Sequence, residues 1–212
     1  MTNIIQMAGL MAPARGEAMA ALEFYFDYRS PYAYLAQSQL HGLGVEVAYR
    51  PFEILGLMDR VGNVPTSITC KAKNRYLGAD LQRWVAVYQV PLQRHPQMAE
   101  IDPRRLLTAT LAADELGLAP QAVGAIFHAF WGSGAPLTTT SDVTAVLNAV
   151  GVGGPDLASR IDDPALDQAL DRATEAAIER GVFGAPTMYV GEEMFFGNDR
   201  FDFVRASLGV AA

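Results

Sequence analysis

The sequence predicts an α/β fold that carries an all-helical insertion, because segments with strand character stand only towards the two ends of the chain. Residues 22–50 have the pattern of a strand, a helix and a second strand, which indicates a βαβ unit with parallel strands. Residues 164–208 have the pattern of a helix, a β-hairpin and a closing helix. The stretch between these segments shows helical periodicity alone. We therefore expect one α/β domain with an insertion and not two domains in series.

The composition restricts the class of protein and of partner. The chain has 212 residues, half of them hydrophobic, and its net charge of −7 argues against nucleic acid or an anionic membrane as a partner. Its one cysteine, Cys70, allows no intrachain disulfide and favours a reducing compartment, so we expect a cytoplasmic protein. No stretch approaches the roughly 18 apolar residues of a membrane helix. Residues 1–19 lack the basic start and the apolar run of a signal peptide, and we expect them to form a disordered extension.

The first expected elements are a strand over residues 22–27, a tight turn and a helix over residues 31–43. The aromatic run at residues 24–26 favours the strand. Ser30 suits the N-cap of the helix, and Pro31 suits its first position, where the missing N–H costs nothing. The unpaired N–H groups at this helix start favour a negative charge, so a thiolate held near Ser30 would be stabilised. On these residues alone, a plain capping role for Ser30 stays open.

Periodicity and capping residues predict the elements in the middle of the chain. Residues 45–50 alternate β-branched side chains and predict a second strand, and residues 62–67 form a loop. Asp102 and the pair Ser141-Asp142 are expected to cap helices. Apolar positions at helical spacing predict helices over residues 52–60, 71–88, 103–117, 120–131, 141–150 and 155–161.

The last part of the chain is expected to return to the sheet. Pro186 precedes a strand and has no N–H to donate to a ladder. A cis bond between Ala185 and Pro186 would turn the backbone of Ala185 outward, where it could pair with an extended peptide. The expected elements are a helix over residues 164–180 that ends at Gly181, strands over 187–190 and 194–196 with a hairpin turn over 191–193, and a helix over 201–208.

Four stretches of this chain together resemble the 2-hydroxychromene-2-carboxylate isomerases, which are relatives of the kappa-class glutathione transferases and of the DsbA oxidoreductases. These stretches are FYFDYRSPYAYLA, the GNVP loop, ADLQRW and RGVFGAPTMYVGEEMFFGNDR, and the resemblance covers nearly the whole chain after Met19. It implies a thioredoxin-like domain over residues 20–52 and 164–212 and an all-helical insertion domain over residues 53–163. It also implies glutathione as the cofactor and a homodimer as the assembly.

The resemblance assigns a role to individual residues. Ser30 matches the catalytic serine of the family, at the place where redox relatives carry the first cysteine of a C-x-x-C pair that this chain lacks. Lys73 matches a lysine that pairs with the glycine carboxylate of glutathione, and Lys71 stays an alternative. Asn198 and Asp199 match the residues that hold the γ-glutamyl end. The full glutathione-binding set that the resemblance implies is Ser30, Asn63, Lys73, Ala185, Pro186, Asn198 and Asp199.

The physical needs of glutathione agree with this placement. The ligand is a short extended peptide with two carboxylates, one ammonium group and one thiol, so its site needs a β-like edge, a cation, an anion and a place for a thiolate. A thiol with a pKa of about 8.5 is mostly protonated at neutral pH. A hydroxyl donor at a helix N-terminus lowers that pKa.

The resemblance also implies a reaction. The glutathione thiolate adds reversibly to an enone, the double bond becomes single and rotates, and elimination restores the alkene in the other geometry. The compounds interconverted are 2-hydroxychromene-2-carboxylate and trans-o-hydroxybenzylidenepyruvate or a related aromatic-derived enone acid. Ser30 stabilises the thiolate and is not the nucleophile, and Arg60 and Arg94 are candidates for the substrate carboxylate. Naphthalene-pathway members of the family carry Asn-Arg where this chain has Ser67-Ile68, which leaves the exact substrate open.

The sequence leaves two alternative functions open. A kappa-like glutathione transferase acting on electrophiles and a non-catalytic thiol-peptide binding module are the alternatives. The three histidines, His41, His95 and His128, lie in unrelated segments and predict no metal site. Cys70 lies in a polar loop and is assigned no active role, and Asp199-Arg200 without the resemblance is a plain cap with a surface ion pair. Helical spacing predicts core positions rather than a substrate pocket for Trp84, Tyr88, Phe127, Phe130 and Trp131.

Overall fold

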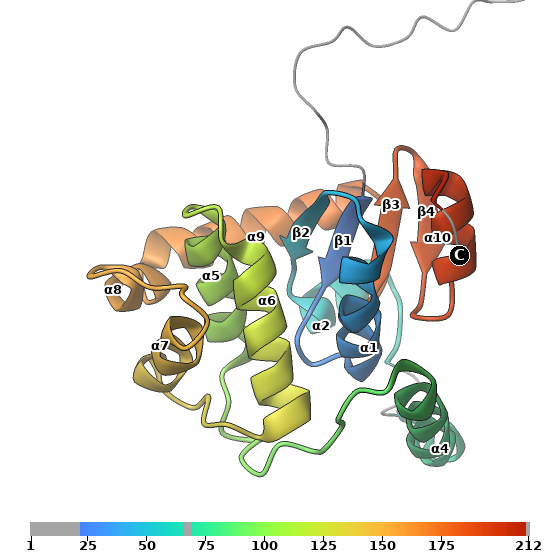
Figure 1. Cartoon of the computed structure of the whole chain (residues 1–212), viewed down its shortest axis with the longest axis horizontal. Helices are drawn as coiled ribbons and strands as arrows, with labels where there is room; N and C mark the ends of the chain where they lie inside the picture. The colour runs from blue at the N-terminus through green and yellow to red at the C-terminus, as the bar shows by residue number, and fades with distance from the viewer. Residues whose placement is uncertain (1–21, 66–68, 211–212) are drawn as a thin grey trace, which may run out of the picture.

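A four-stranded sheet in the order β2-β1-β3-β4 organises the computed structural model, which describes residues 22–65 and 69–210 (Figure 1). β1 (Leu22–Phe26) and β2 (Val47–Pro51) run parallel, which confirms the predicted βαβ unit. β3 (Thr187–Val190) is antiparallel to β1 and to β4 (Glu193–Phe196). The expected extension at residues 1–19 lies outside the described residues.

Helices cover both faces of the sheet, because successive side chains of β1 point to opposite sides. Phe24 and Phe26 face a core that includes residues of α1 and α10. Tyr25 faces a second core, to which α2 and α9 contribute together with Tyr189. The bounds are Pro31–Leu40 for α1, Ile54–Arg60 for α2, Pro164–Glu179 for α9 and Phe201–Leu208 for α10, and a 3-10 turn at His41–Leu43 follows α1.

The remaining helices form the long connection between β2 and α9. In Figure 1, α5, α6, α7 and α8 gather on one side of the sheet, whereas α4 lies apart from them. α4 packs against α1. The fold is therefore thioredoxin-like with a mixed sheet and a large helical insertion, while the limits proposed for the insertion domain stay a prediction. The bounds are Lys71–Tyr88 for α4, Pro103–Asp114 for α5, Ala119–Phe127 for α6, Thr140–Asn148 for α7 and Leu157–Ile161 for α8.

Three local predictions need correction. β2 begins at Val47 and not at residue 45, because its ladder starts opposite Leu22, and it includes Pro51, which an edge strand tolerates. The helix expected over residues 120–131 ends as an α-helix at Phe127 and continues as a π-helical turn at His128–Ser133.

The cap of α7 is also different from the prediction. Thr139, and not the pair Ser141-Asp142, supplies the N-cap. The Thr139 hydroxyl accepts from the backbone N–H of Asp142, and the Asp142 carboxylate accepts from the backbone N–H of Thr139. This capping box satisfies two N–H groups at once, so it places the helix start one residue before Ser141.

Aromatic packing joins the helical block to the end of β1. The ring of Phe127 lies 5.5 Å from that of Phe26 and 4.6 Å from that of Tyr28 between centroids. The Tyr28 hydroxyl lies 2.5 Å from the Thr110 hydroxyl of α5, and the Trp131 indole N–H donates to the Tyr28 carbonyl. The helical insertion therefore supports the chain immediately before the turn into α1.

The core prediction for the aromatic residues holds in part. Phe127 and Phe130 are buried, as expected. Trp131, Trp84 and Tyr88 are only partly buried. None of the helices in the described part of the chain has the length and hydropathy that a membrane crossing needs.

Phe127→Ala should lower the free energy of unfolding by about 3–5 kcal/mol, because it removes a fully buried ring between β1 and the helical block. Urea denaturation monitored by circular dichroism measures this cost. Val87→Ala, at an exposed position of α4, is the control and should change stability by no more than about 0.5 kcal/mol. A cost below about 1 kcal/mol for Phe127→Ala would contradict the packing described here.

Candidate functional site

The turn between β1 and α1 is built around the carboxylate of Asp27, whose side chain is fully buried. Its Oδ1 accepts from the backbone N–H of Arg29 at 2.8 Å, and its backbone carbonyl accepts from the N–H of Ser30 at 3.0 Å. The Arg29 guanidinium forms an ion pair with the same carboxylate. A buried charge requires such partners, so the conformation of residues 27–30 is closely specified.

Ser30 is the N-cap of α1, as the sequence predicts. Its Oγ accepts from the backbone N–H of Ala33 at 3.2 Å, and Pro31 occupies the first helical turn. The same Oγ donates to the backbone carbonyl of Ala185 at 3.0 Å. Ser30 therefore fills two roles, since its lone pair caps the helix and its proton reaches a segment 155 positions away.

The bond between Ala185 and Pro186 is cis. It precedes β3, and the carbonyl of Pro186 accepts from the N–H of Gly197 at 3.0 Å. The Ala185 carbonyl, expected to be free for a peptide ligand, already accepts from Ser30. A carbonyl oxygen has two lone pairs, so a second donor remains compatible with this contact.

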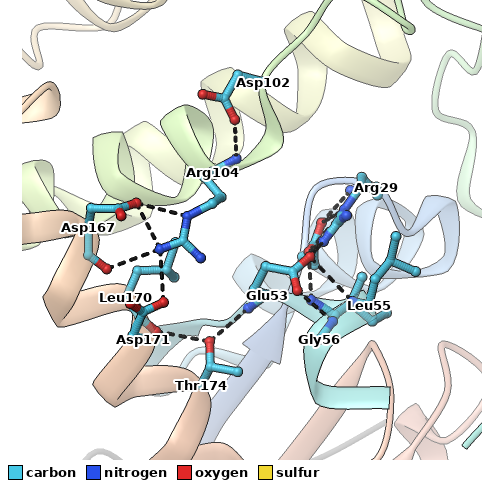
Figure 2. Close-up of polar contacts among 12 residues, drawn as sticks. Arg29, Glu53, Leu55, Gly56, Asp102, Arg104, Asp167, Leu170, Asp171 and Thr174 are labelled. Atoms are coloured by element: carbon cyan, nitrogen blue, oxygen red, sulfur yellow. Dashed lines mark hydrogen bonds and ion pairs between the residues drawn. The ribbon is translucent and has the colours of Figure 1, made fainter. Parts of the chain in front are cut away.

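An ion-pair cluster connects this turn to α2 (Figure 2). Arg29 pairs with Glu53 as well as with Asp27. Glu53 caps α2 through the backbone N–H of Gly56, and Asp27 accepts from the N–H of Ile54 at 2.9 Å. Glu53 also donates its own N–H to the Thr174 hydroxyl of α9. The start of α2 is thus held to the residues that position Ser30.

Asn63 connects the other end of α2 to the cis-proline loop. Its backbone N–H donates to the Met58 carbonyl at 2.8 Å, and its side-chain Nδ2 donates to the Phe183 carbonyl at 2.7 Å. Phe183 precedes Ala185 by two residues. The structure therefore brings Ser30, Asn63 and Ala185 to one place through side chain–backbone hydrogen bonds.

Asn198 lies next to the same loop, because the N–H of the preceding residue, Gly197, donates a hydrogen bond to the Pro186 carbonyl. It is 4% exposed, and its side-chain Nδ2 is buried without a hydrogen-bond partner. Its backbone carbonyl accepts from the Tyr88 hydroxyl at 2.7 Å. A buried N–H without a partner is costly in a native structure, so Nδ2 of Asn198 is a candidate donor to a ligand.

The charged residues of the expected site are exposed, in contrast to the buried Asn198. Asp199 is exposed and forms an ion pair with Arg200 at 2.6 Å, as in the plain reading of this pair. Lys71 and Lys73 are both exposed in the first turn of α4, so the structure leaves the choice between them open. Arg60 forms an ion pair with Glu175 of α9, and Arg94 is exposed in the segment after α4.

Among the described residues, Cys70 and the histidines take no part in the hydrogen bonds described above. Cys70 is the N-cap of α4, and the backbone N–H groups of Lys73 and Ala72 lower the pKa of its thiol. His95 is buried, with Nε2 at 2.8 Å from the Ala135 carbonyl. Across residues 22–65 and 69–210, no three His, Cys, Asp or Glu side chains gather as metal ligands. Ser67-Ile68, where the family pattern differs, lies outside the described residues.

Sequence reasoning missed the cluster of Asp27, Arg29 and Glu53, and it missed the contact of Tyr88. Asp27 and Arg29 lie on either side of Tyr28, just before the expected cap Ser30. Two opposite charges at this spacing were the signal that could have indicated the ion pair. No sequence pattern pointed to Tyr88, because its partner Asn198 is 110 positions away.

Comparisons with known proteins place the chain among proteins of the same fold. A family model described as a DSBA-like thioredoxin domain matches residues 21–209. The 2-hydroxychromene-2-carboxylate isomerase of Pseudomonas putida is 34% identical over 193 residues, which cover 89% of this chain and 94% of that protein. A solved structure of a 2-hydroxychromene-2-carboxylate isomerase has a TM-score of 0.80 at 33% identity, over 89% of this chain and 94% of the other. Glutathione S-transferase kappa 1 of Caenorhabditis elegans is 27% identical, over 86% of this chain and 88% of the transferase.

Glu53→Gln should weaken the dependence of stability on acid pH. Burial alone would raise the pKa of the Glu53 carboxyl, but the hydrogen bonds from Arg29 and from the Gly56 N–H outweigh it and hold the pKa below its ordinary value. The stability that this carboxylate contributes is complete above about pH 4.5 and is lost as the pH falls through the lower folded-state pKa.

Urea titrations at pH values from about 6 to about 3 measure the free energy of unfolding and test this prediction, because this range covers the titration of Glu carboxyl groups. The variant is expected to lose less stability over that range than the wild type. Glu46→Gln, at an exposed position, controls for the loss of one negative charge. Equal pH dependence in Glu53→Gln and the wild type would refute the role given to the ion pair.

Proposed function

This chain belongs to the 2-hydroxychromene-2-carboxylate isomerase family of DSBA-like thioredoxin domains, and on that premise we propose that it is a glutathione-dependent isomerase. Its proposed substrates are 2-hydroxychromene-2-carboxylate and trans-o-hydroxybenzylidenepyruvate or a related aromatic-derived enone acid. The observation that carries the proposal is the meeting of Ser30 at the α1 N-terminus with Ala185 of the cis-proline loop.

The residues present fit glutathione in three respects. The α1 N-terminus with the Ser30 hydroxyl suits a thiolate. The backbone beside the cis bond suits an extended peptide. The buried Nδ2 of Asn198 has no protein acceptor, and a carboxylate or carbonyl of the ligand would supply one.

In the proposed complex, each part of the ligand has a candidate partner. Ala185 with Pro186 offers a main-chain edge to the cysteinyl part. Asn198 and Asp199 hold the γ-glutamyl end, and Asp199 turns from Arg200 towards the ammonium group. Asn63 supports the cysteinyl part through the loop that it holds at Phe183. Lys73 or Lys71 pairs with the glycine carboxylate.

The chemistry that glutathione supplies when bound is a nucleophilic thiol, whose reversible addition to an enone permits rotation about the former double bond. The task of this chain is to lower the pKa of that thiol and to place it. The proton of Ser30 faces the Ala185 carbonyl, so it must turn from that carbonyl to donate to a thiolate. The cap contact from Ala33 uses a lone pair of Oγ and remains available during that change.

The assembly and location are part of the same proposal. Apolar side chains on β4 and α10 are exposed, with Met194, Phe196 and Phe203 at 40%, 41% and 62%, and they offer surface for a homodimer. A cytoplasmic location agrees with a cofactor that acts through a reduced thiol. Sedimentation velocity measures the oligomeric state.

Purified protein should interconvert 2-hydroxychromene-2-carboxylate and its ring-opened isomer only when glutathione is present. The ultraviolet spectrum follows the reaction, and protein without glutathione is the control. No spectral change with glutathione would exclude this isomerase activity. Conjugation of glutathione to electrophiles without isomerisation would favour a kappa-like transferase, a class for which the Caenorhabditis elegans relative gives support. Binding without any turnover would favour a thiol-peptide binding module.

Ser30→Ala should raise the pKa of the bound thiol by about one unit, because it removes a hydroxyl donor to the thiolate. Thiolate absorbance near the ultraviolet edge, titrated against pH with saturating glutathione, measures the shift. Ser38→Ala is the matched control, because Ser38 lies on the same helix and its hydroxyl bonds to the Leu35 carbonyl and the neighbouring Gln39 side chain. An unchanged thiol pKa in Ser30→Ala would remove Ser30 from the proposed mechanism.

A further inference from the structure

Two contacts fix the turn that carries Asn198. On one side, the N–H of Gly197 donates to the Pro186 carbonyl at 3.0 Å. On the other side, the Tyr88 hydroxyl donates to the Asn198 carbonyl at 2.7 Å. Gly197 has φ +106, a conformation that favours glycine, so this turn has a defined shape. These two contacts hold the backbone from which the Asn198 side chain projects.

Tyr88 is well placed to act as a fixed donor. It lies at the C-terminal end of α4, and its ring packs against that of Trp84 with centroids 5.3 Å apart. Burial raises the pKa of its hydroxyl, and the charges of Asp199 and Asp202 raise it further against the opposing effect of the Asn198 contact. The hydroxyl therefore keeps its proton at neutral pH and remains a donor.

α4 has few buried side chains. Leu81 is its one buried residue. Nearer the middle of the helix, Asp80 accepts from the Tyr32 hydroxyl of α1 at 2.7 Å and from the exposed Tyr76 of α4 itself at 3.2 Å. The Tyr88 contact joins the C-terminal end of α4 to the loop of the proposed site.

We propose that Tyr88 is a positioning residue, whose hydroxyl holds the Asn198 backbone so that the buried, unpartnered amide of Asn198 is aimed at the γ-glutamyl end of glutathione. This inference rests on the proposed function. It assigns to α4 a part in recognising the ligand, through Asn198 and without contact between Tyr88 and the ligand.

Tyr88→Phe tests the inference, because it removes the hydroxyl and keeps the ring. Calorimetry should show glutathione binding weakened about fivefold, the effect of one neutral hydrogen bond. Cysteinylglycine, which lacks the γ-glutamyl group, is measured by displacement of glutathione, and its affinity should stay within about twofold of the wild-type value. Tyr76→Phe makes the same change on the same helix and should alter neither affinity.

The outcomes separate the inference from the function on which it rests. Equal weakening of both peptides in Tyr88→Phe would indicate a merely structural role and overturn the inference, and so would no change for either peptide. Failure of the wild type to bind glutathione would overturn the proposed function and the inference together. In an Asn198→Ala background, adding Tyr88→Phe should change glutathione affinity by less than about twofold, and a full fivefold further loss would show that Tyr88 does not act through Asn198.

Discussion

The buried carboxylate of Asp27 is the constraint on which the site depends. Taking an ionised carboxylate out of water costs several kcal/mol unless a cation and hydrogen-bond donors replace the water. Here the partners are the Arg29 backbone and guanidinium and the N–H of Ile54. Satisfying this one charge therefore determines both the turn that ends at Ser30 and the start of α2. The position of the buried Asp27 carboxylate therefore constrains the geometry of the site.

The same constraint extends around a closed circuit of contacts. Arg29 reaches α2 through Glu53, and Asn63 lies three residues after α2 ends at Arg60. Asn63 holds the Phe183 carbonyl, and Ala185 two residues later accepts from Ser30. Each contact joins a side chain to a backbone or to an oppositely charged group, so the circuit does not depend on close matching of apolar shapes. A change in one contact should be transmitted to the others, since the segments share short loops.

Elements with local signals were predictable from the sequence to the residue. α4, β3 and α10 begin and end where periodicity and turn residues place them, and Ser30 is the cap that its position indicates. The site set came from the resemblance, and the structure gathers Ser30, Asn63, Ala185 and Asn198 near the cis-proline loop.

Sequence patterns did not show the hydrogen-bond partners of these residues. Asn63 bonds to Phe183 across 120 positions, and the cis bond is a property of the folded loop. Such contacts arise from tertiary packing, for which periodicity and capping rules carry no signal. The displaced cap at Thr139 is a smaller case of competition between two local signals.

The two roles that the sequence allows for Ser30, a helix cap and a functional hydroxyl, are compatible in the structure. A cap uses an oxygen lone pair, whereas stabilising an anion uses the hydroxyl proton. That proton is donated to the carbonyl of Ala185, which belongs to the same loop that would receive an extended peptide. A thiolate brought in by a ligand would thus meet a hydroxyl whose oxygen is held by the helix cap and whose proton has to turn from the Ala185 carbonyl. The position of the oxygen is preorganised and only its O–H bond has to rotate, which suits the proposed reaction, in which a bound thiol would supply the nucleophile.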